Sequence, residues 1–221
     1  MDIIKTRHSV RSYHDKPLEQ NQIEQLQAEI MSCHQESGLN IQLVLNEKEA
    51  FQGLMAHYGK LRNVNNYIAM VGKKSQDLDE KIGYYGERLV LKAQQLGLNT
   101  CWVALTYRKG KCQSLCNHDE KCVCVIALGY GVTQGVPHKS KPIHKFCHSE
   151  GKPDWFIKGV EAAMYAPTAL NQQKFFFDFL RFSIGSESEI PSSLKEANRK
   201  ELYRIAQKQC LVGILFDGIQ K

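Results

Sequence analysis

Two short polar motifs lie near opposite ends of this 221-residue chain, and most of the sequence separates them. The first, Arg7–Arg11, supplies two guanidinium groups and a hydroxyl within a few residues. Such donors suit a phosphate or the polar edge of a ring. The second, Tyr165–Gln173, is an amide-rich loop after a helix that Pro167 ends. If the two motifs form one site, the fold must bring distant parts of the chain together.

The composition indicates a globular protein. Hydrophobic residues make up 43% of the chain, and the length suits one domain or two small ones. The longest apolar runs, such as Val123–Leu128, are too short to cross a bilayer. The first residues contain no apolar stretch long enough for a signal peptide. We therefore expect a soluble, cytoplasmic protein with no membrane partner.

The net charge of +6 is spread along the chain, with a local concentration over His138–Lys145. Most such charge is solvated surface, although it also suits a phosphorylated cofactor. No basic motif interleaved with aromatic residues is present. We therefore expect no nucleic-acid partner.

The eight cysteines follow no disulfide spacing, which favours free thiols. The group Cys112, Cys116, His118, Cys122 and Cys124 fits no standard zinc pattern. In a regular strand, Cys122 and Cys124 would point to the same face. We expect no metal, and the sequence assigns this group no role.

Hydrophobic periodicity predicts alternating helices and strands in the first two-thirds of the chain. Gly38 and Gly97 follow the two long helices, as expected of C-terminal caps. Gly129-Tyr130-Gly131 breaks the last strand. The predicted elements are helices over Glu19–Glu36 and Leu78–Leu96, and strands over Asn40–Leu45, Tyr67–Val71, Cys101–Leu105 and Cys122–Leu128.

A second, shorter unit follows the polar connection Thr133–Pro153. It is predicted to contain a helix over Trp155–Tyr165, a strand over Phe175–Phe179 and a helix over Glu201–Leu215. Its order of helix, loop and strand matches that of the first unit, with little residue identity. We therefore expect two domains, residues 1–150 and 151–221, as related units of one chain.

Several segments, taken in order with a final loop, resemble the FMN-dependent nitroreductase family. Arg7–Tyr13 is similar to the family's opening motif, and Tyr85–Leu105 is similar to its helix, tight turn and strand beneath the flavin. Val123–Tyr130 resembles the strand that follows, and Lys139-Ser140-Lys141 falls where the family has its second phosphate clamp. The loop at Ala166–Gln173 reads Ala-Pro-Thr-x-x-Asn-x-Gln, like the family's Ala-Pro-Ser-x-x-Asn-x-Gln.

The resemblance implies an α+β fold with three layers, α/β/α, and FMN at the junction of two subunits. At the phosphate end, it implies that Arg7 and either Lys139 or Lys141 hold the FMN phosphate. His8 and Ser9 would support this clamp or the ribityl chain.

At the ring end, the resemblance implies that Arg11 faces the N1–O2 edge, where a cation stabilises the reduced flavin. Trp102 and Val103 belong to the strand beneath the flavin, and Ala104 or Leu105 would direct a backbone N–H at N5. The loop residues that would cover the ring are Pro167, Thr168, Ala169 and Asn171.

The implied activity is hydride transfer from NADH or NADPH, through flavin N5, to a small acceptor such as a nitroaromatic or a quinone. No side chain is expected to act as a general acid or base, because the protein mainly positions and tunes the flavin. One alternative is a non-catalytic flavin-binding protein, acting as a sensor or FMN carrier. Another is a basic nucleic-acid-binding module.

The chain departs from the family pattern after the first long helix. There, Cys33–Asn40 replaces the expected Ala-Pro-Ser-x-x-Asn loop, which reappears at Pro167. We therefore expect the second unit to act as the neighbouring subunit. The protein would then be a monomer with an intrachain pseudo-dimer, or a homodimer that exchanges these units.

Overall fold

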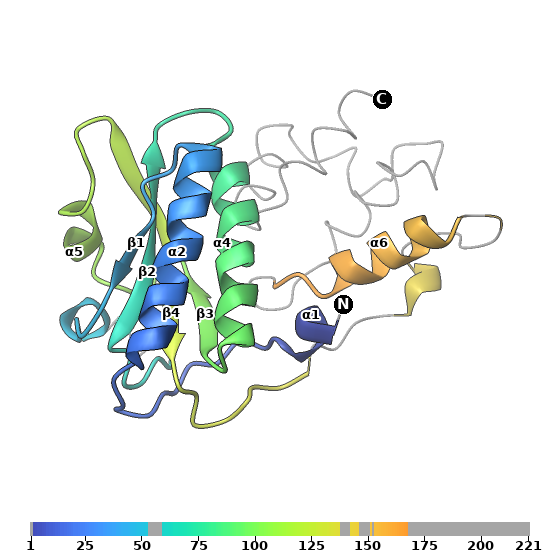
Figure 1. The fold of residues 1–221 in the computed structure, drawn as a ribbon, viewed down its shortest axis with the longest axis horizontal. Coiled ribbons are helices and arrows are strands. Elements are labelled where there is room, and N and C mark those ends of the chain that lie inside the picture. The colour runs from blue at the N-terminus through green and yellow to red at the C-terminus, as the bar shows by residue number, and fades with distance from the viewer. Residues whose placement is uncertain (1, 53–58, 138–141, 146–150, 152, 168–221) are drawn as a thin grey trace. The chain divides into compact units, whose positions relative to one another are not determined.

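The computed structural model describes residues 2–52, 59–137, 142–145, 151 and 153–167. The chain divides into two compact units at the boundary between Pro137 and His138 (Figure 1). The first unit, Asp2–Pro137, contains a four-stranded antiparallel sheet with the strand order β1-β2-β4-β3. The mixed α+β fold expected from the sequence is therefore confirmed. The division into functional domains at residue 150 stays a prediction.

The first unit alternates helices and strands along the chain. Its elements are α1 (Asp2–Thr6), α2 (Gln20–Ser37), β1 (Gln42–Val44), η1 (Glu49–Phe51), β2 (Asn66–Lys73), α4 (Leu78–Gln95), β3 (Asn99–Val103), α5 (Lys109–Gln113) and β4 (Glu120–Gly129). In the second unit, the described elements are η2 (Ile143–Lys145) and α6 (Asp154–Met164). No helix among the described residues is long and apolar enough to cross a membrane.

The predicted helices and strands are confirmed, with shifted ends. Gly38 ends α2 with a φ of 70°, and Gly97 follows α4 with a φ of 76°. Both angles lie in the left-handed region that glycine adopts at low cost. The strand β2 continues through Gly72 to Lys73, beyond the predicted end at Val71. The predicted elements at Phe175–Phe179 and Glu201–Leu215 lie outside the described residues.

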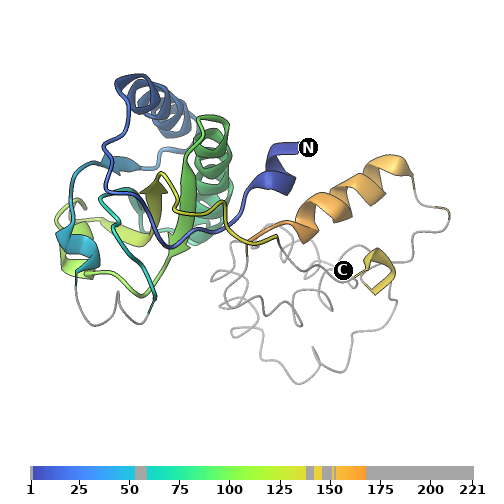
Figure 2. The same ribbon diagram turned by 90° about the horizontal axis from the view of Figure 1, so that it is seen from below.

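Both long helices pack on one face of the sheet (Figure 2). They bury Leu26 and Ile30 of α2 and Leu89 of α4 against Ile68 and Ile126 of the central strands. The apolar residues recur at helical spacing in α2 and α4, which fixes the side of each helix that enters the core. The central strands β2 and β4 are apolar along most of their length, and their residues enter clusters on both faces of the sheet.

Within the described residues, the opposite face of the sheet is covered by short helices and extended segments. Tyr67, Ala69 and Val71 of β2 point to this second face, and Phe51 of η1 and Tyr107 pack on them. Phe51 meets the ring of Tyr67 edge-on, with their centroids 5.7 Å apart. The two faces therefore form two separate apolar clusters.

An irregularity in the central strand pair corrects one expectation. Val71 pairs with Cys122, whereas the preceding Met70 pairs with Cys124, so Val123 is an extra residue in β4. Such a bulge turns the side chains on its two sides to different faces. Cys124 packs in the cluster under α2 and α4, and Cys122 packs in the cluster on the second face. The prediction that both cysteines share a face is wrong for this reason.

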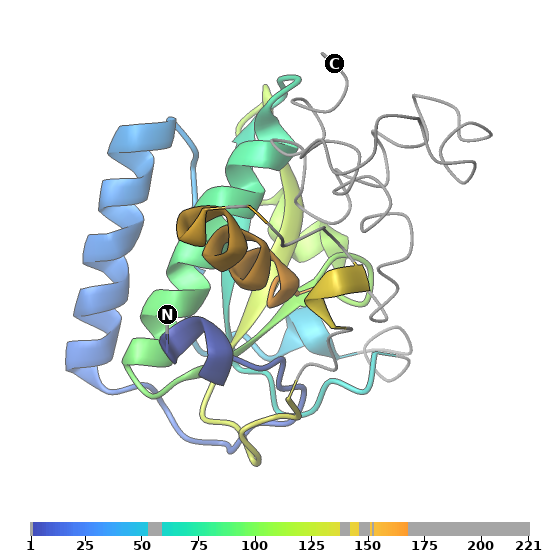
Figure 3. The same cartoon turned by 90° about the vertical axis from the view of Figure 1, so that its right-hand side faces the viewer.

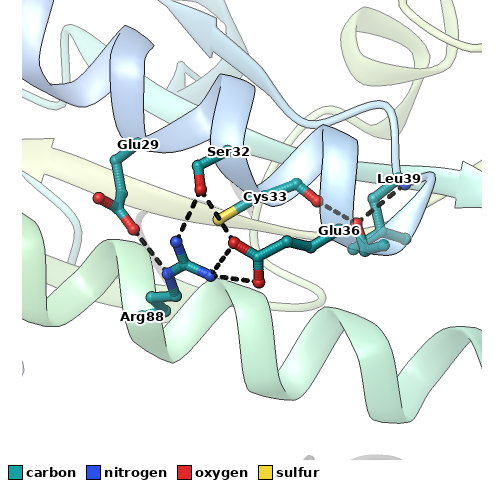
Figure 4. Close-up of polar contacts among 7 residues, drawn as sticks. Glu29, Ser32, Cys33, Glu36, Leu39 and Arg88 are labelled. Atoms are coloured by element: carbon teal, nitrogen blue, oxygen red, sulfur yellow. Dashed lines mark hydrogen bonds and ion pairs between the residues drawn. The ribbon is translucent and has the colours of Figure 1, made fainter.

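A polar clamp joins α2 to α4 on their outer surface (Figure 4). The Arg88 guanidinium donates to Glu29 Oε1 at 2.6 Å and to both carboxylate oxygens of Glu36 at 2.7 and 2.8 Å. It also donates to Ser32 Oγ at 3.0 Å. The hydrogen bonds from Arg88 and Ser32 hold the pKa of Glu36 below its ordinary value. One arginine thus engages three side chains along α2.

Replacing Arg88 with methionine tests this clamp. Arg88→Met keeps most of the aliphatic stem and removes every hydrogen bond to α2, so we expect a melting temperature several degrees lower in thermal unfolding. Lys92→Met is the matched control, because Lys92 makes a single contact to α2, at 2.9 Å to Gln25. If Arg88→Met lowers the melting temperature no more than Lys92→Met does, the result would contradict a stabilising role of the clamp.

The same clamp predicts a dependence on pH. Because folding lowers the pKa of Glu36, its contribution to stability is complete above the ordinary value of 4.5 and is lost as the pH falls through the folded pKa. The difference in melting temperature between wild type and Arg88→Met should therefore be full at pH 7 and shrink below about pH 4.

Candidate functional site

The Arg7–Arg11 motif lies along the open edge of β3. Ser9 pairs with Thr100 in a parallel bridge, and the Val10 N–H donates to the Thr100 carbonyl at 3.0 Å. The motif begins where the short helix α1 ends, and α1 contacts α4 (Figure 3). Backbone pairing, rather than side-chain packing alone, therefore holds the motif beside the strand.

The chain leaving β4 returns to the same motif. The Gly131 N–H donates to Asn99 Oδ1 at 2.9 Å, and Asn99 Nδ2 donates to Gln134 Oε1 at 3.0 Å. Gly135 has a φ of 80°, and a Cβ there would lie 2.6 Å from the Cβ of His8. Only glycine allows this approach without strain. The segment after β4 is therefore fixed against the arginine motif.

Arg7 is almost fully buried, with 5% of its surface exposed. Its Nε lies 3.4 Å from Glu87 Oε1, and Glu87 Oε2 accepts a hydrogen bond from Trp102 Nε1 at 3.1 Å. Burial raises the pKa of Glu87, whereas the Arg7 charge and the Trp102 hydrogen bond oppose this rise. One carboxylate thus links α4, β3 and the arginine motif.

No sequence pattern pointed to Glu87 as a site residue. A single glutamate on a long helix is ordinary, and its partners lie far from it along the chain. The predicted residue Trp102 does lie at the site, half-buried in β3. Its indole N–H supports the carboxylate that pairs with Arg7.

His8 is partly exposed, and Ser9 is exposed. Burial, and secondarily the charge of Arg7, lowers the pKa of His8 below its ordinary value. The imidazole is therefore neutral at pH 7, and it can donate one hydrogen bond and accept another. The two residues provide neutral polar groups next to the buried arginine.

The strand β3 ends at Val103, so the predicted buried strand over Cys101–Leu105 is too long. Val103 is buried, but Ala104 is exposed and Leu105 has 66% of its surface exposed. Arg11 is also exposed, and its charge acts on the buried Cys101 thiol of β3. An exposed cation and an exposed aliphatic side chain therefore lie on two paired segments. This combination suits a flat apolar ring with a polar edge.

The roles of the remaining predicted site residues stay predictions. Lys139, Lys141, Thr168, Ala169 and Asn171 lie outside the described residues. Pro167 is described in the second unit, just after α6, where it is partly buried. Across the described ranges, no three His, Cys, Asp or Glu side chains are grouped to hold a metal.

The α+β sheet and the arginine motif along its edge strand agree with the resemblance found in the sequence. The model of the family described as "Putative TM nitroreductase" matches residues 1–198, and the chain belongs to this family. No curated protein sequence matches the chain.

Several solved structures share the fold. A "putative nitroreductase" from Thermotoga maritima is 24% identical, with a TM-score of 0.54, and the match covers 78% of this chain and 67% of that one. A "Putative NADH Oxidase" from Clostridium acetobutylicum is 19% identical, with a TM-score of 0.55 and coverage of 68% and 100%. A "putative nitroreductase in complex with fmn" from Desulfovibrio desulfuricans is 16% identical, with a TM-score of 0.53 and coverage of 69% and 96%.

Gly86 allows the indole of Trp102 to lie against α4. A Cβ at Gly86 would overlap the six-membered ring of Trp102 and lie 3.1 Å from Met70 Cε. Alanine inside a helix normally stabilises it by roughly 0.5–1 kcal/mol relative to glycine. We expect Gly86→Ala to destabilise the protein instead, by about 1–3 kcal/mol in urea unfolding, because the hydrogen-bonded indole must move.

Gly110→Ala in α5 is the control for this prediction. A Cβ at Gly110 would meet no atom within 4 Å, so that substitution should be neutral or stabilising. A Gly86→Ala protein as stable as wild type would show that the indole moves without cost.

Proposed function

We propose that this protein binds FMN and is an oxidoreductase that takes electrons from NADH or NADPH and delivers them to a small acceptor, such as a nitroaromatic or a quinone. The observation that carries the proposal is the pairing of the Arg7–Arg11 motif with Thr100 on the edge of β3, the strand beyond whose end Ala104 and Leu105 are exposed. Two proteins of similar structure support the choice of cofactor: an "FMN-dependent Nitroreductase" from Clostridium difficile and the Desulfovibrio desulfuricans "putative nitroreductase in complex with fmn".

The phosphate end fits the residues at the start of the motif. Arg7 supplies a guanidinium that Glu87 orients, and Ser9 supplies an exposed hydroxyl. We assign the second cationic contact to Lys139 or Lys141, because the chain before them is fixed against His8 at Gly135. Arginine and lysine are suited to phosphate by charge-assisted hydrogen bonds.

The ring end fits the residues where β3 ends. We assign Arg11 to the N1–O2 edge and a backbone N–H of Ala104 or Leu105 to N5. Trp102 and Val103 would lie in the strand beneath the ring. FMN held by these residues would supply a hydride acceptor at N5. The protein's part is to bind and orient the ring and to exclude water from it.

We further propose that the second unit covers the ring with Pro167, Thr168, Ala169 and Asn171. The first unit has only a short connection where the family has this loop. In the described structure, α2 ends at Ser37, and the chain passes through Gly38 to β1, which begins at Gln42. Residues 1–150 and 151–221 would then act as the two halves of one site. The halves belong to one chain in a pseudo-dimer, or to two chains that exchange their second units.

The visible spectrum of the purified protein tests the function. We expect it to bind FMN at one flavin per chain and its flavin absorbance to bleach on anaerobic addition of NADH or NADPH. A colourless protein that FMN does not saturate would overturn the proposal. Bound FMN that neither nucleotide bleaches would identify a sensor or carrier instead of an enzyme.

Arg7→Ala tests the phosphate clamp. The loss of one charge-assisted contact costs about 1.5–3 kcal/mol, so FMN affinity should fall at least about tenfold. Riboflavin, which lacks the phosphate, should bind with nearly unchanged affinity. Arg7→Lys, which keeps the charge, should recover part of the loss, and Lys5→Ala removes a nearby exposed charge as the control. Equal losses for FMN and riboflavin would remove Arg7 from this role.

Arg11→Gln tests the ring edge. Without the cation, the reduced and anionic flavin is less stable, so the midpoint potential should become more negative. A shift of 30 mV corresponds to about 1.4 kcal/mol for two electrons. The control is Arg62→Gln, because Arg62 is exposed and donates its backbone N–H to the Arg11 carbonyl at 2.8 Å. A potentiometric titration with no shift, or with an upward one, would contradict the assignment.

A further inference from the structure

A cluster of thiols and phenols lies on the sheet face opposite α2 and α4. It comprises Cys112 of α5, Cys116 just after that helix, Cys122 of β4, Tyr67 of β2 and Tyr107. None of these residues has a part in the proposed flavin site. The bulge in β4 is what brings Cys122 to this face, because a regular strand would place it with Cys124 in the other core.

Two of the cysteines, Cys112 and Cys122, belong to the same cluster on this face of the sheet. The Cys112 thiol is in hydrogen-bonding contact with the Cys122 thiol and with the Tyr67 hydroxyl. The Tyr107 hydroxyl lies 3.9 Å from Cys122 Sγ. Cys116 Sγ donates to the Cys112 carbonyl at 3.5 Å, and Cys122 Sγ lies 3.4 Å from the Cys124 carbonyl. The side-chain contact between Cys112 and Cys122 makes these two cysteines the candidate pair.

The environment favours a thiolate in this pair. Hydrogen bonds from Cys122 and Tyr67 lower the pKa of Cys112, and the same contact with Cys112 raises the pKa of Cys122. Cys112 therefore ionises more readily than Cys122, and the thiolate is the reactive form of cysteine. Cys112 is buried, but Cys122 and Cys116 are partly exposed, so a small oxidant can approach from their side. A metal does not explain the cluster, because these described residues form no metal-holding group.

We propose that Cys112 and Cys122 are a peroxide-oxidisable dithiol that closes reversibly to a disulfide. The thiolate sulfur attacks one oxygen of hydrogen peroxide, the O–O bond breaks, and the departing hydroxide takes up a proton to leave as water. The partner thiol then loses its proton and attacks the sulfenic sulfur. The S–S bond forms, the S–O bond breaks, and a second water leaves. Two thiols are oxidised and one peroxide is reduced.

The disulfide would join α5 to β4 across a short loop, residues 112–122. Closing a loop restricts the unfolded chain, so oxidation should stabilise this part of the first unit. The inference is independent of FMN, since it rests on the cluster alone.

Trypsin separates the two cysteines, which makes the disulfide easy to detect in the full chain. Cleavage after Lys111, Lys121 and Lys139 gives peptides 112–121 and 122–139. After treatment of the reduced protein with hydrogen peroxide and alkylation of the remaining thiols, mass spectrometry should show these peptides cross-linked. Dithiothreitol should release them. A Cys112–Cys116 disulfide would lie within one peptide and would give no cross-link.

Single cysteine variants identify which two residues form the disulfide. The cross-link should vanish in Cys112→Ala and Cys122→Ala and persist in the matched controls Cys116→Ala and Cys124→Ala. Melting curves of the reduced variants confirm that each is folded, and Cys112→Ser and Cys122→Ser serve as second variants where alanine leaves a cavity. A cross-link that survives the loss of Cys112 would overturn the assignment. So would a wild-type protein whose cysteines reach sulfinic acid with no cross-link formed.

Discussion

The pairing of β2 with β4 in the middle of the sheet determines where every functional group of the first unit lies. Both strands are buried on both faces, and their register runs from the Asn66–Leu128 pair to the Lys73–Glu120 pair. At one end, β4 positions β3, on whose free edge the arginine motif lies. At the other end, its bulge turns Cys122 toward Cys112. A shift of register by one residue would exchange the two faces and remove both arrangements.

The candidate flavin site depends on contacts among the Arg7–Arg11 motif, the strand β3 and the helix α4. Backbone pairing holds the arginine motif to β3, and Glu87 of α4 holds Arg7 from the opposite side. Trp102 fixes that carboxylate, and Gly86 gives the indole its space. The Arg7 guanidinium that would bind a phosphate is therefore held by α4 and β3 as well as by its own loop. Such support is what a binding site needs to hold its donors in place.

The two faces of the sheet differ in the side chains that cover them. One face is a continuous apolar core under α2 and α4, closed on its outer side by the Arg88 clamp. The other face carries short segments, with thiols and phenols among its apolar residues. Because short helices leave Cys116 and Cys122 partly exposed, this face admits a small oxidant. The thick core and the reactive cluster are separated by the sheet itself.

The sequence by itself determined the helices, the strands and the opening motif of this protein. Those signals are local: helical spacing in α2 and α4, glycines after their ends, and the residues from Arg7 to Arg11. The tertiary structure alone decided that Arg7 pairs with Glu87, that Leu105 lies exposed beyond β3, and that Cys122 and Cys124 face opposite ways. Each of these depends on a strand end, a bulge or a contact between distant residues. No local pattern encodes such features, because periodicity assumes regular strands and reports only near neighbours along the chain.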